Sequence, residues 1–401
     1  MKRNILIILI SCITLLYSEN KIGLVLSGGG VKGMGHIGTL QLIDSLNIPI
    51  DYIVGTSIGS IAAGLYASGY SADEIEYLSF NTNWDEIFSQ NKKRNHLYFF
   101  QKLNSNSHQL EFELNGFKPT PPLGLTNGQY SYEYLSNLFN VYNGINSFDQ
   151  LYIPFKCNAV DLISGEEIIF ETGSIATALR ASTSIPTVFS PIEYNSYLLI
   201  DGGIKNNFPT NLVKNMGANF IIGVNVSSQE KNKDDIKSVL DIISTTFNLY
   251  NKKQTKNNID LTNILIEPKF QNISSINFDI STMNKFNNNG KRTAYEKIEE
   301  LQALHSELNI SNEYLKLSSL KNNFIINSIS LDTSILESSI ISDILNPYIG
   351  INISKNTFIK LITKIRALKK YRNLHYKFKQ KNIQNISYEL FIKAESIQPI
   401  I

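Results

Sequence analysis

The chain has 401 residues, 42% of them hydrophobic, and carries a formal net charge of +2. This length is enough for two domains with a large core. A charge so close to zero excludes nucleic acid as a partner that binds the whole molecule by electrostatic attraction.

The first residues, 1–18, have the pattern of a secretory signal peptide. Lys2 and Arg3 precede an apolar run that is shorter than the roughly 20 residues needed to span a bilayer. The run ends at Ser18, a small residue before polar sequence, so we expect cleavage there and export. Lipidation at Cys12 is the alternative, because the residues around it resemble a lipoprotein cleavage box. Without Cys12 only Cys157 remains, and an internal disulfide is excluded.

A glycine-rich loop follows the first predicted strand, 23–26. The loop contains four glycines and a lysine: Gly28, Gly29, Gly30, Lys32 and Gly33. Because an amphipathic helix comes next, amides left free in the loop form a cradle for an anion. A dinucleotide site is not favoured, because Asp51 precedes its strand and is at the wrong end to reach a ribose. A P-loop is excluded, because Lys32 comes before Gly33 and no Lys-Ser/Thr pair follows it.

The next strand and helix enclose the pattern of a nucleophile elbow. The apolar strand 52–54 runs into Gly55-Thr56-Ser57-Ile58-Gly59, and apolar residues at helical spacing follow. The flanking glycines, Gly55 and Gly59, leave room where a Cβ would clash in a sharp turn. Ser57 is then a candidate nucleophile near the positive end of a helix. The alternative is an ordinary N-capping serine.

No histidine lies in a setting that recommends it as the base for this serine. His36 shares the apolar face of the helix after the glycine loop, so we expect it to be a packed core residue. The region 81–129 is irregular, with aromatic residues that include Trp84, Phe88 and the run 97–100. It is interpreted either as a lid that meets lipid or as a helical insertion with its own small core. A helix is expected around 134–139.

Strands and helices alternate in the following part of the chain. Predicted strands cover 155–161, 168–170, 197–200, 220–226 and 263–266, and predicted helices cover 175–182, 236–250 and a segment from Tyr295 to Leu304. This alternation predicts an α/β fold with a mostly parallel sheet covered by helices on both faces. Asp201-Gly202-Gly203 follows a strand end, where a catalytic carboxylate would lie in an open sheet, although a turn aspartate is the alternative.

The glycine loop, the elbow and the Asp201-Gly202-Gly203 motif, in this order, resemble the patatin-like phospholipase family. The resemblance extends through residues 181–186 and 207–209 and covers roughly 21–305. It implies that Gly28, Gly29 and Gly30 form an oxyanion hole. It also implies that Ser57 is the nucleophile and Asp201 its partner in a Ser–Asp dyad. Lys32, Gly33, Gly55, Gly59, Gly202 and Gly203 are expected to support these motifs, and neither a metal nor another cofactor is implied.

Such a dyad accounts for the missing histidine. An aspartate is a weak base at its ordinary pKa of about 3.9, so it must be held close to the serine and partly desolvated. The resemblance implies an exported lipid acyl hydrolase of the phospholipase A or lysophospholipase type. An acyltransferase that uses the same dyad is an alternative, and the lipid substrate implies work at a membrane surface.

The tail predicts a small α+β domain in the order strand, helix, helix, strand, strand, over 324–331, 336–345, 358–368, 371–378 and 388–392. It resembles a POTRA domain. The expected organisation is a signal peptide over 1–18, a patatin-like domain over 20–306, a linker over 307–322 and the POTRA-like domain over 323–397. The basic residues around 360–379 indicate a solvated face or, alternatively, contact with anionic lipid.

The combined domains resemble patatin-bearing type V autotransporters of Gram-negative bacteria. This resemblance implies the periplasm, the outer membrane or the cell surface as the location. It also implies an outer-membrane barrel or secretion partner that residues 323–397 contact. A second hypothesis therefore makes the protein a secretion or assembly module that binds a partner strand by β-augmentation.

Overall fold

The computed structural model describes residues 20–88, 113–115, 118–120, 123–227, 233, 236, 239–270, 277–333, 335–382 and 386–397. The predicted signal peptide and residues 97–100 of the expected lid or insertion lie outside the described residues. Within the described part of the chain, no helix is both long and apolar enough to cross a membrane.

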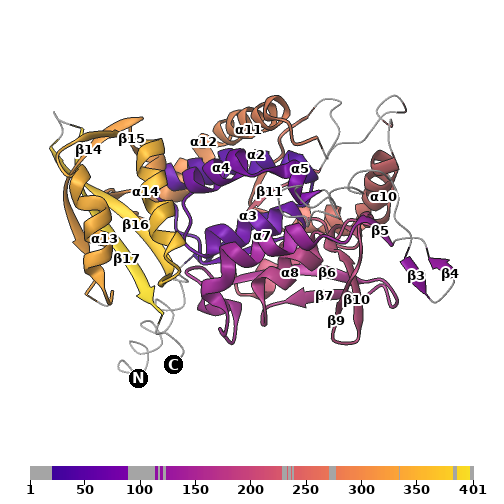
Figure 1. Ribbon diagram of the computed structural model, residues 1–401. Helices are drawn as coiled ribbons and strands as arrows, with labels where there is room; N and C mark the ends of the chain where they lie inside the picture. Colours follow the sequence, from indigo (N-terminus) through magenta and orange to yellow (C-terminus); the bar gives the residue numbers. More distant parts are fainter. Residues whose placement is uncertain are drawn as a thin grey trace, which may run out of the picture.

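An eight-stranded sheet organises the N-terminal part of the molecule (Figure 1). Its path is β12-β11-β1-β2-β6-β10-β9, and β7 also pairs with β6. Five strands are parallel: β1 (Ile22–Leu26), β2 (Tyr52–Gly55), β6 (Phe155–Asp161), β11 (Phe220–Val224) and β12 (Ile264–Ile266). Three strands pair antiparallel: β7 (Glu167–Phe170), β9 (Ile192–Tyr194) and β10 (Tyr197–Asp201). The predicted mostly parallel sheet is confirmed.

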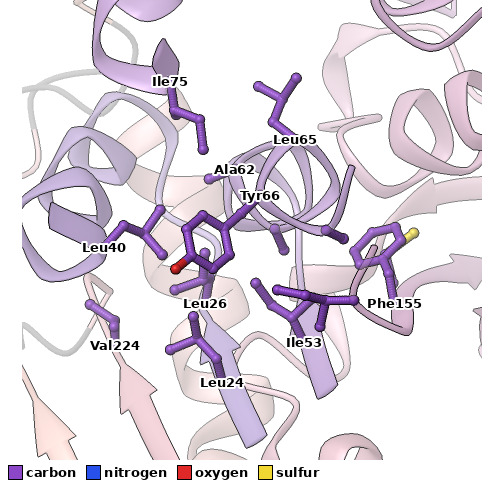
Figure 2. Close-up of a cluster of buried hydrophobic side chains, with 14 of the residues drawn as sticks. Leu24, Leu26, Leu40, Ile53, Ala62, Leu65, Tyr66, Ile75, Phe155 and Val224 are labelled. Carbon is purple, nitrogen blue, oxygen red and sulfur yellow. The ribbon is translucent and has the colours of Figure 1, made fainter. Parts of the chain in front are cut away.

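Both faces of this sheet are buried, as the run of apolar residues in β1 predicts. Leu24 and Leu26 belong to the main core, where Figure 2 shows them below Leu40 and Tyr66. Val25 points to the other face and packs in a smaller cluster with helix α9 (Thr210–Asn215). Helices therefore cover both faces, as expected.

The remaining helices of this part are α2 (Met34–Ser45), α3 (Ile58–Ala67), α4 (Ala72–Asn81), α5 (Trp84–Ile87), α7 (Gln129–Phe139), α8 (Ile175–Ser182), α10 (Val239–Ile259), α11 (Ile280–Tyr295) and α12 (Ile298–Glu307). Two short sheets pair β3 (Glu113–Asn115) with β4 (Lys118–Thr120) and β5 (Gly124–Thr126) with β8 (Thr187–Phe189).

Several predicted boundaries differ from the structure. The strand expected to reach Val226 ends at Val224, and the helix expected to end at Tyr250 continues to Ile259. The single helix expected from Tyr295 to Leu304 is the end of α11 followed by α12. Hydrophobic spacing marks the buried faces but carries little information about where a polar helix end stops.

A second, five-stranded sheet forms the C-terminal part, in the order β13-β16-β17-β14-β15. Its elements are β13 (Tyr314–Leu315), β14 (Asn323–Leu331), α13 (Ser338–Leu345), β15 (Asn352–Ser354), α14 (Lys355–Ala367), β16 (Tyr371–Asn382) and β17 (Ser387–Ser396). The order strand, helix, helix, strand, strand is as predicted, and β13 and β15 are additional short edge strands. Residues 314–315, expected in a linker, pair with β16, and Leu317 and Leu320 belong to the C-terminal core.

Buried ion pairs join the two parts of the molecule. The guanidinium of Arg366 on α14 donates to both carboxylate oxygens of Glu74 at the start of α4, at 2.8 and 3.3 Å. Arg366 also donates to the carbonyl of Gly69 at 2.8 Å. Lys316 donates to the buried carboxylate of Asp44, at the end of α2, at 2.8 Å. Because α2 begins directly after the glycine loop, the C-terminal part is anchored to an element that shapes the site.

Candidate active site

Ser57 lies in a sharp turn between β2 and α3. Its backbone φ is +53°, in the left-handed region that residues other than glycine seldom adopt. A Cβ added at Gly59 would lie 2.3 Å from the carbonyl oxygen of Leu26, and one at Gly55 would lie 2.4 Å from that of Gly59. The two glycines therefore allow the close packing that holds the serine in its strained conformation.

The hydroxyl of Ser57 donates a hydrogen bond to the carboxylate of Asp201. The distance from Oγ to Oδ2 is 2.6 Å, and both residues are buried. The other carboxylate oxygen, Oδ1, accepts from the backbone amide of Gly203 at 2.7 Å. The amide of Ser57 itself donates to Ser182 Oγ at 2.9 Å. The structure thus brings together the two residues that were expected to form the dyad.

An antiparallel strand delivers Asp201 to the elbow. In the sheet, Gly55 pairs with Cys157 of β6, whereas Asp201 pairs with Ala159, two residues farther along β6. Asp201 was expected at a strand end in an open sheet, and it is the last residue of β10, which pairs antiparallel with β6. β6 continues beyond the end of β2. β10 pairs antiparallel with this part of β6 and ends beside the elbow.

Burial controls the electrostatics of the site. It raises the pKa of Asp201 to about 6, although the hydrogen bonds from Ser57 and Gly203 favour the charged form. An aspartate with this pKa is a better proton acceptor than a solvated one, while it remains largely ionised at neutral pH. Ser57 also precedes the N-terminus of α3, whose partial positive charge favours negative charge at this position.

His36 takes no part in the dyad. Its Nε2 contacts the carbonyl oxygen of Ser27 at 2.8 Å, and the ring is fully buried. Burial lowers the pKa of His36 to about 4, so the ring is neutral at physiological pH. This position agrees with the expectation of a packed core histidine.

The three glycines that were expected to form the oxyanion hole differ in their contacts. Gly29 and Gly30 line the same pocket as Ser57 and Asp201. The amide of Gly28 instead donates to the carbonyl of Asn207 at 3.1 Å, and an oxyanion role for Gly28 stays a prediction. Within the described part of the chain, no loop or turn carbonyl accepts a hydrogen bond from the amide of Gly29 or Gly30.

The other motif residues occupy supporting positions. Lys32 lines the pocket, and Gly33 packs against the side chain of Ile58 at the start of α3. Gly202 lies against the carbonyl of Asn158, and its neighbour Gly203 supplies the amide that orients Asp201.

Several supporting polar residues were not assigned a role from the sequence. Asn158 accepts a hydrogen bond from Thr56 at 2.7 Å and donates to the carbonyl of Asn206 at 3.0 Å. These bonds tie the elbow to the turn that follows Asp201. The role of Asn158 could have been suspected from the sequence, because it is a polar residue inside a predicted buried strand and a buried amide needs hydrogen-bond partners. Ser182 offered no such signal at the end of its helix.

Two cavities meet at Ser57. The first is lined by the glycine loop, Asp201, Asn207 and side chains of α10. The second is almost wholly apolar, and its lining includes Ser57 and Gly30 together with Ile61, Trp84, Ile87, Phe88, Ile185, Phe189 and Phe278. Among the described residues, no group of three or more His, Cys, Asp or Glu side chains is arranged to hold a metal ion.

Comparisons with known proteins agree with these motifs. Residues 24–214 match the family model described as patatin-like phospholipase. The Lysophospholipase NTE1 proteins of Meyerozyma guilliermondii and Candida albicans are 32% and 33% identical over 211 residues. Each match covers 53% of this chain and 13% of the relative, so the chain spans only a small part of those proteins. The crystal structure of VipD from Legionella pneumophila aligns with a TM-score of 0.38 and 12% identity, over 70% of this chain and 67% of that chain.

The family model spans the glycine loop, the elbow and the aspartate motif, and the sequence similarity to the lysophospholipases covers about the same length of chain. Residues 24–214 therefore match the patatin-like phospholipase family model and are similar in sequence to a segment of the NTE1 lysophospholipases.

Proposed function

We propose that this protein hydrolyses acyl esters of lipids, as a phospholipase or lysophospholipase, with Ser57 and Asp201 as its catalytic dyad. The observation that carries the proposal is the 2.6 Å contact between Ser57 Oγ and the buried Asp201 carboxylate, beside an apolar cavity. The family match and the relatives named lysophospholipase support the substrate class.

The reaction follows from the geometry. Ser57 Oγ attacks the ester carbonyl carbon while Asp201 accepts the hydroxyl proton. The amides of Gly29 and Gly30 stabilise the oxyanion, and the departing alcohol takes the proton from Asp201. Water then attacks the acyl-enzyme with Asp201 again as the base, which releases the fatty acid and restores Ser57.

The apolar cavity is suited to the acyl chain. In its wall, the rings of Trp84 and Phe278 are stacked with 4.3 Å between their centroids, and those of Phe88 and Phe278 are tilted with 5.1 Å between theirs. Burial of a methylene group in such a cavity contributes about 0.8 kcal/mol. The part of the acyl chain next to the ester would therefore bind there, with the ester carbonyl at Ser57.

Labelling with a fluorophosphonate probe tests the nucleophile. We expect Ser57→Ala to abolish labelling and Asp201→Asn to slow it by at least about a hundredfold, the usual contribution of a general base. Ser68→Ala, at the opposite end of α3, is the matched control and should label like the wild type. Labelling that persists in Ser57→Ala would place the nucleophile elsewhere and refute the dyad.

We also propose export and a partner for the C-terminal part. The N-terminal sequence pattern supports export, and the predicted POTRA-like character rests on the order of elements around a mixed sheet. Among the described residues, β15 pairs with β14 only from Asn323 to Ile325, so the later part of that edge could accept an added strand. Pull-down with residues 314–397 should capture an outer-membrane or secretion component, and the absence of any stable partner would count against the proposal.

A further inference from the structure

Helix α10 forms one wall of the catalytic pocket. Ile243, Ser244, Phe247 and Asn248 line that pocket together with Ser57 and Asp201. The side chain of Asn251 donates to the carbonyl of Gly203 at 2.6 Å, next to the amide that orients the catalytic carboxylate. Asn258, two turns farther on, donates to the carbonyl of Phe208 at 2.7 Å. The inner face of α10 is thus fixed to the active site.

The outer face of the same helix exposes three large apolar side chains together with the polar Thr246. Ile242, Leu249 and Tyr250 are 55%, 69% and 69% exposed. Since residues seven apart lie on one side of a helix, Ile242 and Leu249 form a stripe that faces away from most of the pocket lining, and the exposed Tyr250 lies beside this stripe. The exposed lysines Lys253 and Lys256 continue the stripe toward the end of α10.

We propose that this outer face of α10, made of Ile242, Leu249, Tyr250, Lys253 and Lys256, docks the enzyme on the surface of a lipid bilayer or micelle. The inference rests on the proposed function, because a lipid hydrolase must reach an ester at such a surface. Ile242, Leu249 and Tyr250 enter the interfacial layer, and the two lysines bind anionic head groups. The inner face of the helix then lies next to the point where a lipid leaves the surface for Ser57.

The composition of the stripe favours lipid over a protein partner. A stable protein interface buries about 800 Å² on each side, much more than three side chains present. Exposed apolar side chains beside lysines provide the two interactions that hold a protein at an anionic lipid surface, apolar insertion and charge attraction. The location agrees, because Figure 1 shows α10 at the end of the molecule away from the C-terminal sheet, where docking leaves that part free.

Binding to vesicles that cannot be hydrolysed tests the surface without turnover. The full chain is sedimented with vesicles of ether-linked phosphatidylcholine, alone or mixed with equal parts of ether-linked phosphatidylglycerol. We expect Ile242→Ser/Leu249→Ser/Tyr250→Ser to bind both vesicles at least about tenfold more weakly, because three apolar insertions are lost. Lys253→Glu/Lys256→Glu should lose the preference for anionic vesicles, by about tenfold.

A matched control removes three exposed apolar side chains that are not part of the pocket lining. Ile163, Tyr295 and Leu336 are 80%, 59% and 58% exposed, and the triple serine variant should bind vesicles like the wild type. Hydrolysis of a water-soluble short-chain ester should be unchanged in both triple variants, which shows that they are folded and that the dyad is intact.

The outcomes separate this inference from the proposed function. If the α10 triple variant binds vesicles as tightly as the wild type, the docking surface is wrong, whatever the enzyme hydrolyses. If the wild type binds through α10 but hydrolyses no ester, the docking surface stands and the proposed function fails. If the wild type is a dimer that the α10 variant converts to monomers, without a change in vesicle binding, the face is an interface between copies and the inference is overturned.

Discussion

Asp201 is held where its negative charge is unfavourable for folding but useful for catalysis. Burial raises its pKa, and its two hydrogen bonds orient one oxygen toward Ser57 and the other toward Gly203. Ser57 also occupies a strained backbone conformation. Strain and desolvation concentrated in two neighbouring residues are typical of a catalytic site rather than of a structural turn.

The first prediction concerns the pH dependence of activity. Asp201 must be ionised to accept the proton of Ser57, and its pKa is about 6. We therefore expect kcat/KM for a soluble ester to rise with pH through this value and to level off above it. Steady-state rates across this range provide the measurement, and a profile that stays flat below pH 6 would show that Asp201 is not the base.

The second prediction concerns stability. The Asp201 carboxyl has a higher pKa in the folded protein, about 6, than its ordinary value of 3.8. It therefore binds its proton more tightly when folded, and the stability of the fold decreases as pH rises between these two values. The difference corresponds to at most about 3 kcal/mol. We expect Asp201→Asn to unfold at higher urea concentration than the wild type above pH 6 and at a similar concentration below pH 3.8. Lower stability of Asp201→Asn at both pH values would contradict this account.

At the scale of elements, α3 has two roles. Its first residue follows Ser57, and one turn later Ile61 lines the apolar cavity. The helix thus positions the nucleophile and also bounds the space for the acyl chain. Because one rigid helix carries both features, its geometry sets the distance from the ester carbonyl at Ser57 to the cavity wall at Ile61.

The third prediction follows from this arrangement. Ile61→Phe adds volume to the wall of the cavity, so a long acyl chain should fit less well while a short one is unaffected. We expect the ratio of kcat/KM for a long-chain over a short-chain p-nitrophenyl ester to fall about tenfold, the effect of a one- or two-methylene mismatch. Ile163→Phe, on an exposed turn, should leave the ratio unchanged. An equal loss on both esters would indicate damage to the elbow and not a narrower cavity.

At the scale of the whole molecule, the C-terminal part is closely joined to the domain that carries the dyad. Arg366 lies over the ring of Tyr70, with its Cζ 3.8 Å from the ring centroid, and nearby charge from Glu74 holds the pKa of Arg366 above its ordinary value in spite of burial. Through its buried ion pair with Glu74, Arg366 holds the two parts of the molecule together.

The fourth prediction tests this interface. Arg366→Ala removes the partner of the buried Glu74, and an unpaired buried charge of this kind destabilises a protein by about 3–5 kcal/mol. Lys370→Ala breaks the exposed ion pair with Glu337 and should change stability by about 1 kcal/mol or less. Urea unfolding measures both variants. A similar, small effect of the two substitutions would mean that the interface contributes little to the stability of the molecule.

Local patterns in the sequence predicted much of this architecture. The strand, glycine turn and helix around Ser57 were predictable because a buried strand, a sharp turn and an amphipathic helix each need particular residue types at fixed spacing. The same holds for the strand before Asp201 and for the order of elements in the C-terminal part. The short strands β13 and β15 were missed, because two or three residues show no periodicity and become strands only by pairing with a neighbour.

The remaining features depend on contacts between residues far apart in the chain. Whether β10 runs parallel or antiparallel, and so how Asp201 reaches Ser57, is set by its pairing with the extension of β6. The freedom of a loop amide to bind an oxyanion depends on whether a carbonyl in the protein already accepts its hydrogen bond. The carbonyl of Asn207 reaches the amide of Gly28 only in the folded chain. The chemistry of the site can thus be predicted from the sequence, because it needs particular side chains and glycines in local motifs. The geometry of the site cannot be predicted in this way, because hydrogen-bond partners and burial arise only when distant segments pack together.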